Sequence, residues 1–374
     1  MGGSRGPATR ITASLAALAL LVGTGVLGLG QAPARAARLP AGGPSAAATA
    51  TATATAGADI GDYGVGQAMP HNHLVGPYAW TWHAAFPGAR VILYYGIVGS
   101  PQGGVIGYYG GNEDGLLSQL RQQGQAYATL DPSHPVVEGL DIADPLADAL
   151  PQQGYWIDRM DPDTVQHYVD LTRANHMVFF MDMQIGFSTV QRELAYLWPY
   201  LQLPWVNLGM DPEWDHAYNG QGDGCPGFVD NIDATGRMRA SEINYVMQQL
   251  SALVIANHLP PKILLVHQYQ FGENPNYPGD CGQTLPSEGW QHIKLLPGVQ
   301  LVINTDGVGC AACGGPPAKA ADYDVFDHDQ HIQYAGIKLY QYYPILTPNF
   351  YDEPQMTPSD VLNLDPPPNL VMYQ

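Results

Sequence analysis

Charged side chains are scarce in this chain of 374 residues: Asp, Glu, Lys and Arg make up 13% of it. Basic residues are rarer still, with 15 Lys and Arg against 34 Asp and Glu, which gives a formal net charge of -19 at pH 7. A field of that sign repels nucleic acids, anionic lipids and polyanionic substrates. The shortage of charge therefore favours a neutral partner, and the 22 Tyr and 7 Trp side chains suit stacking against sugar rings.

Several motifs that mark cofactor or metal sites are missing. No GxGxxG or P-loop sequence directly follows an apolar run, so no nucleotide site is expected. No HExxH sequence is present, and we predict neither a metal nor another cofactor.

The longest apolar run lies near the N-terminal end, where residues 13–29 follow Arg5 and Arg10. The small residues Ala34 and Ala36 then resemble a cleavage site, so residues 1–36 are predicted to be a signal peptide and the mature protein to be secreted to the cell envelope or beyond. A retained membrane anchor is the alternative, but we expect no stable membrane insertion after cleavage. Residues 37–75 contain an Ala/Thr-rich tract that cannot bury a core and are predicted to be a linker.

Only four cysteines occur, and an even number in an exported chain predicts disulfides. Three pairings are possible, of which we favour Cys225 with Cys281 and Cys310 with Cys313. The sequence CAAC at 310–313 could also be a redox motif or half of a zinc site, but no second CxxC accompanies it.

Residues 76–374 contain eight apolar runs that alternate with helical segments, which predicts an α/β fold with a single (β/α)8 TIM-type barrel. Near-continuous apolar runs are typical of parallel strands buried on both faces. An open doubly wound sheet is the alternative. The expected strands are 91–98, 126–131, 177–184, 204–211, 262–269, 299–306, 336–343 and 369–374, and the expected helices are 115–125, 161–176, 188–201, 240–258 and 357–364.

Polar residues gather where these expected strands end. In a barrel, the C-terminal ends of all strands meet at one face, which is where barrel enzymes place their active sites. A single Asp at such a place is often only a cap for the next helix, but here several strands share the pattern. The residues are Asp131, Asp182, Gln184, Asp211, Glu213, His267, Gln268, Asn304, Asp306, Tyr340 and Gln341.

The stretch PWVNLGMDPEW at 204–214 carries two carboxylates at the end of the fourth expected strand. Asp211 and Glu213 face the same side by the period of two, although Asp211 could also be a turn residue before a proline. Glycosidic bond cleavage needs such a pair, with one protonated acid and one ionised group. Glu213 beside Trp214 is the predicted acid, and the other predicted catalytic carboxylates are Asp211, Asp182 and Asp306.

In these features the chain resembles secreted barrel glycoside hydrolases. Asp211 and Glu213 are similar to the last part of the DxxDxDxE motif of family 18 chitinases, while Val206 and Gly209 stand at the two earlier Asp positions. The seventh expected strand offers Lys338 and tyrosines where a large retaining group of glycosidases carries a glutamate. The resemblance implies hydrolysis of O-glycosyl bonds.

Lys338 is a charged residue inside an apolar strand. It is predicted to pair with Asp306 or Asp182, and the alternative is a Schiff-base nucleophile of a lyase or aldolase. The acids, together with His267, could also form a metal site.

The sequence thus predicts a secreted, monomeric glycoside hydrolase that cleaves a neutral polysaccharide or oligosaccharide. A non-catalytic glycan-binding barrel of the cell envelope is the alternative. The residues expected to bind substrate are Trp214, Gln184, His267, Gln268, Asn304, Lys338 and Tyr340.

Overall fold

The computed structural model describes residues 86–147, 157–215, 238–268, 291–345 and 351–374. All of them belong to one compact unit, Val65–Gln374. The predicted signal peptide and linker lie outside the described residues, as do Cys225 and Cys281.

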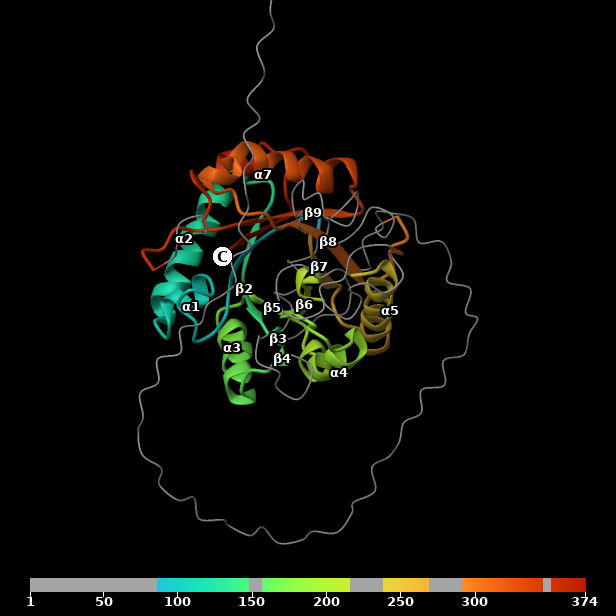
Figure 1. Cartoon of the computed structure of the whole chain (residues 1–374). Helices are drawn as coiled ribbons and strands as arrows, with labels where there is room; N and C mark the ends of the chain where they lie inside the picture. The colour runs from blue at the N-terminus through green and yellow to red at the C-terminus, as the bar shows by residue number, and fades with distance from the viewer. Residues whose placement is uncertain (1–85, 148–156, 216–237, 269–290, 346–350) are drawn as a thin grey trace, which may run out of the picture. The chain divides into compact units, whose positions relative to one another are not determined.

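Eight parallel strands close into a barrel in the order β1-β10-β9-β8-β7-β6-β5-β2 (Figure 1). This confirms the predicted (β/α)8 TIM-type fold. A separate antiparallel pair is formed by β3 (Leu146–Ala147) and β4 (Ile157–Asp158). The barrel strands are β1 (Arg90–Gly96), β2 (Val136–Ala143), β5 (Val178–Met183), β6 (Val206–Met210), β7 (Lys262–Gln268), β8 (Val299–Thr305), β9 (Tyr334–Leu339) and β10 (Leu370–Tyr373).

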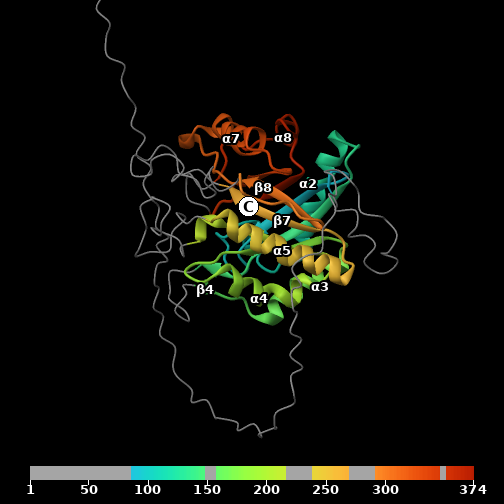
Figure 2. The same ribbon diagram turned by 90° about the vertical axis from the view of Figure 1, so that its right-hand side faces the viewer.

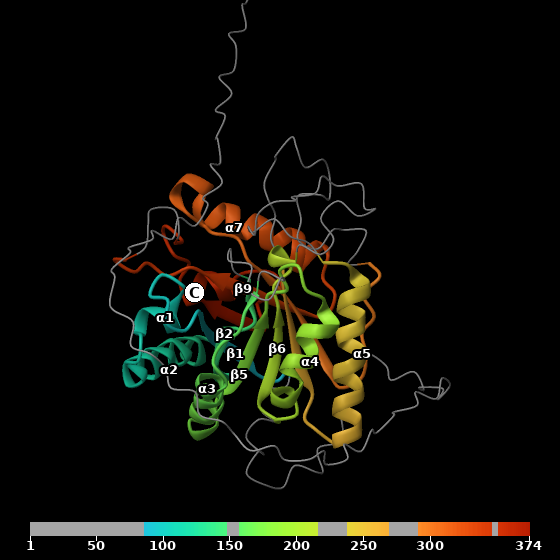
Figure 3. The ribbon, with the colours of Figure 1, turned by 60° about the horizontal axis from the view of Figure 1, so that its bottom comes forward.

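Helices cover the outside of the strands, and Figure 3 shows α3, α4 and α5 in this layer. Figure 2 shows α4 and α5 alongside one another, where they are in contact. The α-helices are α1 (Val105–Tyr109), α2 (Glu113–Leu130), α3 (Pro162–Ala174), α4 (Val190–Leu201), α5 (Ala240–Asn257), α7 (Gly315–Tyr323) and α8 (Pro358–Leu362). The other helical segments are the 3₁₀ turns η3 (Pro212–Trp214) and η5 (Ala311–Cys313) and the π-helical segment η6 (Asp324–Asp329).

The starts of these helices follow from local side-chain chemistry. Asp161 caps α3 by accepting a hydrogen bond from the backbone N–H of Thr164, and Pro162 occupies the first helical position. Thr357 and Asp360 form a capping box at α8. These caps satisfy backbone N–H groups that a helix start leaves unpaired.

The predicted second strand is wrong. Residues 126–131 form the end of helix α2 and its C-cap, because Tyr127 continues the buried helical face that contains Leu120. The second strand is instead β2, whose sequence VVEGLDIA is interrupted by polar residues and Gly. Asp131 consequently lies at the start of β1, where its Oδ2 accepts a hydrogen bond from Arg90 Nη1 at 2.9 Å, and not among the acids at the other end of the barrel.

The barrel interior is filled by alternate residues of each strand. Near the N-terminal ends of the strands the interior is apolar. These residues form one hydrophobic cluster, and the residues between strands and helices form a second, separate cluster. Further along the same strands the inward positions become polar, so the apolar part forms a floor beneath them. The apolar interior includes Val91, Leu93, Val137, Val178, Phe180, Ile263, Leu265, Val302, Leu370 and Met372.

The predicted disulfide between Cys310 and Cys313 is present and encloses η5. No helix within the described ranges is long and apolar enough to cross a membrane.

Candidate active site

Polar side chains from neighbouring strands meet at the C-terminal ends of the barrel strands. Each is less than a tenth exposed, and the strand-end pattern of the sequence thus brings most of the predicted residues together. They are Asp182 and Gln184 from β5 and its end, Asp211 after β6, His267 and Gln268 from β7, Asn304 and Asp306 from β8 and its end, and Lys338 and Tyr340 from β9 and its end.

His267 lies between two carboxylates. Its Nδ1 is 2.8 Å from Asp306 Oδ2, and its Nε2 is 3.0 Å from Asp182 Oδ2. Burial by itself lowers the pKa of His267, but the negative charges of Asp182 and Asp306 outweigh it and raise the pKa well above its usual value. The imidazole is therefore a buried cation that joins β5, β7 and β8.

Asp306 is held by three donors. Its Oδ2 accepts from Lys338 Nζ at 3.0 Å as well as from His267, and the hydroxyl of Tyr340 donates to Oδ1. Burial raises the pKa of Asp306, but the charge of Lys338 and the bond from His267 bring it below its usual value. Asp306 is thus an ionised carboxylate, fixed in orientation.

Lys338 forms the ion pair with Asp306 that its sequence position predicts. Its Nζ also lies 4.3 Å from the centre of the Tyr95 ring, a cation–π contact. Burial lowers the pKa of Lys338, yet Asp306 and the other acids raise it above its usual value. A protonated lysine cannot act as a nucleophile, so this environment disfavours Schiff-base chemistry.

Asp211 is fixed through Gln184. Gln184 Nε2 donates to Asp211 Oδ2 at 3.1 Å, while Gln184 Oε1 accepts from the backbone N–H of Ala147 at 3.0 Å. Burial raises the pKa of Asp211 to about 7. Near neutral pH, this carboxyl therefore exists in both protonation states.

Glu213 is the more accessible acid of the site. It lies in η3, is half-buried, and its neighbour Trp214 is anchored because its carbonyl accepts from the N–H of Gly186 at 2.8 Å. Burial raises the pKa of Glu213 well above its usual value, and the charges of Asp211 and Asp306 raise it further. One carboxyl oxygen from each of these three acids lies within 4.8 Å of the others.

The same three acids are, within the described part of the chain, the group whose spacing could hold a metal ion. Lys338 already supplies a fixed positive charge to Asp306 from the other side. The arrangement therefore offers oxygen ligands of the kind that hard divalent cations prefer, next to a lysine that reduces the charge left for such a cation.

Gly209 has no side chain, and this leaves room for the carboxylate of Asp182 inside the barrel. The two residues are partners in the register of β5 and β6, and a Cβ atom on Gly209 would lie 2.4 Å from Asp182 Oδ1. Gly209 stands where the chitinase motif carries an Asp. In this barrel the carboxylate of the neighbouring strand fills the space that such a side chain would need.

Asp141 is an acid that sequence reasoning missed. It lies in β2, is fully buried, and neither of its carboxyl oxygens has a hydrogen-bond partner among the described residues. Burial, followed by the charge of Asp182, raises its pKa well above its usual value. Its position in VVEGLDIA is the only signal in the sequence, and Glu138 and Gly139 interrupt the apolar pattern that marks the other strands.

Asn304 and Gln268, predicted to bind substrate, are at most 1% exposed. Asn304 Nδ2 lies 3.5 Å from His267 Nδ1, and the carbonyl of Gln268 accepts from the N–H of Asp306 at 2.8 Å. Their contacts therefore position His267 and Asp306.

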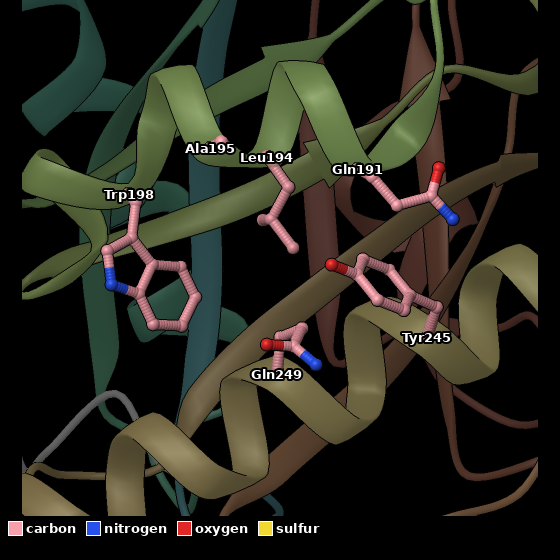
Figure 4. A pocket seen from close by; sticks show the side chains of 6 residues that line it. All are labelled: Gln191, Leu194, Ala195, Trp198, Tyr245 and Gln249. Atoms are coloured by element: carbon pink, nitrogen blue, oxygen red, sulfur yellow. The ribbon is translucent and has the colours of Figure 1, made fainter. Parts of the chain in front are cut away.

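A pocket lies between α4 and α5 in the helix layer (Figure 4). An indole, a phenol and two carboxamides converge on it, and it contains no carboxylate or imidazole. It is therefore separate in both place and chemistry from the acids at the strand ends. Its lining residues are Gln191, Leu194, Ala195, Trp198, Tyr245 and Gln249.

Comparisons with known protein families, curated proteins and solved structures find no match to this chain.

Proposed function

We propose that the protein is a secreted glycoside hydrolase that cleaves a neutral polysaccharide or oligosaccharide. One observation carries this proposal: Glu213, with a raised pKa, lies within 4.8 Å of Asp306, with a lowered pKa. Two carboxyl groups whose environments drive their pKa values apart supply the acid and the ionised group that glycosidic cleavage requires.

In this proposal Glu213 donates its proton to the leaving oxygen while the bond to the anomeric carbon breaks. Asp306 attacks that carbon from the opposite side and forms a glycosyl ester. Water then hydrolyses the ester, with Glu213 taking the proton from water. The separation of the two groups favours retention, because retaining enzymes place their carboxyls roughly 5–5.5 Å apart and inverting enzymes roughly 6.5–9.5 Å apart.

Asp211 keeps Glu213 protonated. The charge of Asp211 is among the causes that raise the pKa of Glu213, and the two groups lie close enough to titrate as a pair. Lys338, Tyr340 and His267 act through Asp306, because they hold its carboxylate ionised and immobile.

The test is the release of reducing ends from a panel of neutral glycans by the full chain and by single variants. Glu213→Gln and Asp306→Asn should each lower the rate by at least about 100-fold, since general acid catalysis alone contributes 10²–10⁴-fold. Glu113→Gln is the matched control, because Glu113 lies in α2 and contacts His167 on the surface. Full activity in either site variant, or no release from any neutral glycan, contradicts the proposal.

A non-catalytic glycan-binding barrel is the second candidate. The observation that favours it is that Asp306 is 1% exposed and that both of its oxygens already accept hydrogen bonds. Such a carboxylate could serve only to hold the barrel mouth together. This candidate predicts saturable binding of a neutral polysaccharide that Asp306→Asn leaves intact, with no release of products.

A further inference from the structure

Two pairs of tyrosine rings, Tyr108 with Tyr343 and Tyr342 with Tyr351, are joined through the adjacent residues Tyr342 and Tyr343, and we call the four residues the tyrosine strip. Tyr108 and Tyr342 are its exposed members, while Tyr343 is buried beneath Tyr108. We infer that this strip binds successive sugar rings of a neutral polysaccharide chain whose scissile bond lies at Glu213 and Asp306. The inference rests on the proposed function, which supplies the class of ligand.

The strip and the residues next to it carry half of the exposed large hydrophobic side chains of the described ranges. Six large hydrophobic side chains are more than a third exposed in the described ranges. Three of them are Tyr108 and Tyr342 of the strip and Ile345, which lies two residues after Tyr343. Tyr342 is the most exposed of all, at 60%. Isolated exposed apolar residues need no explanation, but exposed rings that are each packed against another tyrosine are typical of a binding surface.

The rings of the strip hold one another in place. Tyr108 stacks on Tyr343 with ring centroids 4.1 Å apart, and Tyr342 contacts Tyr351 edge-on at 4.8 Å. The hydroxyl of Tyr343 also donates to Gln341 Oε1. Ligand binding therefore costs little side-chain entropy, which is the condition for an efficient stacking surface.

The strip begins where the carboxylate site ends. Tyr340, whose hydroxyl donates to Asp306, is followed two residues later by Tyr342. Tyr108 lies in α1, which follows the C-terminal end of β1, and β1 and β9 both pair with β10. A polymer held at the carboxylates would thus meet the tyrosines on the side of the mouth formed by β9, β10 and β1.

The chemistry of the strip selects an uncharged ligand. Residues 341–345 are Gln, Tyr, Tyr, Pro and Ile, without a carboxylate or an amine. Exposed phenol rings offer a flat apolar face together with a hydroxyl, which suits a sugar ring that has an apolar face and hydroxyl edges. The net charge of -19 further opposes a carboxylated or sulfated polymer.

The experiment is affinity electrophoresis of the full chain through gels that contain a soluble β-glucan, xylan, galactomannan or amylose. Every protein carries Glu213→Gln so that the polymer is not consumed. We compare the background protein with added Tyr342→Ala, Tyr342→Phe, Tyr108→Ala and Leu130→Ala. Leu130 is the matched control, because it is 53% exposed at the end of α2, next to Asp131 on the opposite side of the barrel.

At least one polymer should retard the background protein. Tyr342→Ala and Tyr108→Ala should weaken that binding by about tenfold, while Tyr342→Phe stays within about threefold because it keeps the ring. Leu130→Ala should change nothing. The inference is overturned if none of the neutral polymers retards the protein, or if both alanine variants bind as tightly as the background.

Failure of the inference about the strip can be distinguished from failure of the proposed function. Binding that depends on the tyrosines, without any release of reducing ends by the unmodified chain, supports the strip and contradicts hydrolysis. Hydrolysis by a protein whose binding does not depend on the tyrosines supports the proposed function and contradicts the inference about the strip.

Discussion

The buried pair of Lys338 and Asp306 gives a quantitative prediction for the substitution Lys338→Met. The Nζ and Oδ2 atoms are 3.0 Å apart and both side chains are at most 3% exposed. Two unit charges at that distance attract by roughly 5.5 kcal/mol at an effective dielectric constant of about 20. His267 and Tyr340 still hold Asp306 in the variant, so we expect the free energy of unfolding to fall by about 3–5 kcal/mol at neutral pH, as is typical when one partner of a buried pair is removed.

The loss in free energy of unfolding caused by Lys338→Met should depend on pH. In the native protein the pKa of Asp306 is lowered, so the ionised carboxylate contributes stability above its unfolded pKa and loses it as the pH falls through the folded value. Without Lys338, the pKa of Asp306 rises from its native value, because only His267 and Tyr340 then oppose the effect of burial, and protonation relieves part of the charge that Lys338 had balanced. The difference between variant and native protein should therefore be smaller at pH 4.5 than at pH 6.5.

Urea unfolding at both pH values measures these differences. Lys262→Met is the matched control, because Lys262 is a fully buried lysine that donates to the carbonyls of Leu203 and Val206. Burial lowers the pKa of Lys262 to about 7, so its effect on stability changes with pH only above that value. A loss below about 1 kcal/mol for Lys338→Met, or a loss equal at pH 4.5 and 6.5, would refute the reasoning.

Three further predictions concern the same site. Asp211→Asn should move the alkaline limb of the pH profile of kcat/KM to lower pH, because the charge of Asp211 helps to raise the pKa of Glu213; an unmoved limb contradicts this. Gly209→Ala should cost about 1–3 kcal/mol in urea unfolding, since its Cβ would lie 2.4 Å from Asp182 Oδ1; a neutral substitution would show that Asp182 can move away. His267 should give imidazolium ¹⁵N shifts throughout pH 6 to 8, whereas a titration near its usual pKa of about 6.5 would contradict the buried cation.

The fold could be predicted largely because the strands of a parallel barrel are buried on both faces. Seven of the eight expected strands overlap barrel strands, and only the second is misplaced. That error has a physical cause. The end of α2, AYATL, is locally as apolar as a strand, while β2 carries Glu138, Gly139 and Asp141 and shows no continuous apolar run.

The sequence predicts which residues belong to the candidate site, but it does not predict which of them contact one another. The placement of Asp182, Asp211 and Asp306 follows from the rule that strand C-terminal ends converge. The position of His267 between Asp182 and Asp306 depends on the register of three different strands, which local sequence does not specify. Asp141 could not be predicted, because β2, which carries it, has no continuous apolar run.

The pairing of Asp182 with Gly209 has a consequence for how such proteins can be found. A motif read along one strand assumes that all its side chains come from that strand, whereas here one carboxylate enters the same space from the adjacent strand. Two barrels can therefore present similar charge at their mouths while their linear signatures differ. Patterns compiled around the circumference of the barrel, layer by layer, would detect relationships that patterns along the chain overlook.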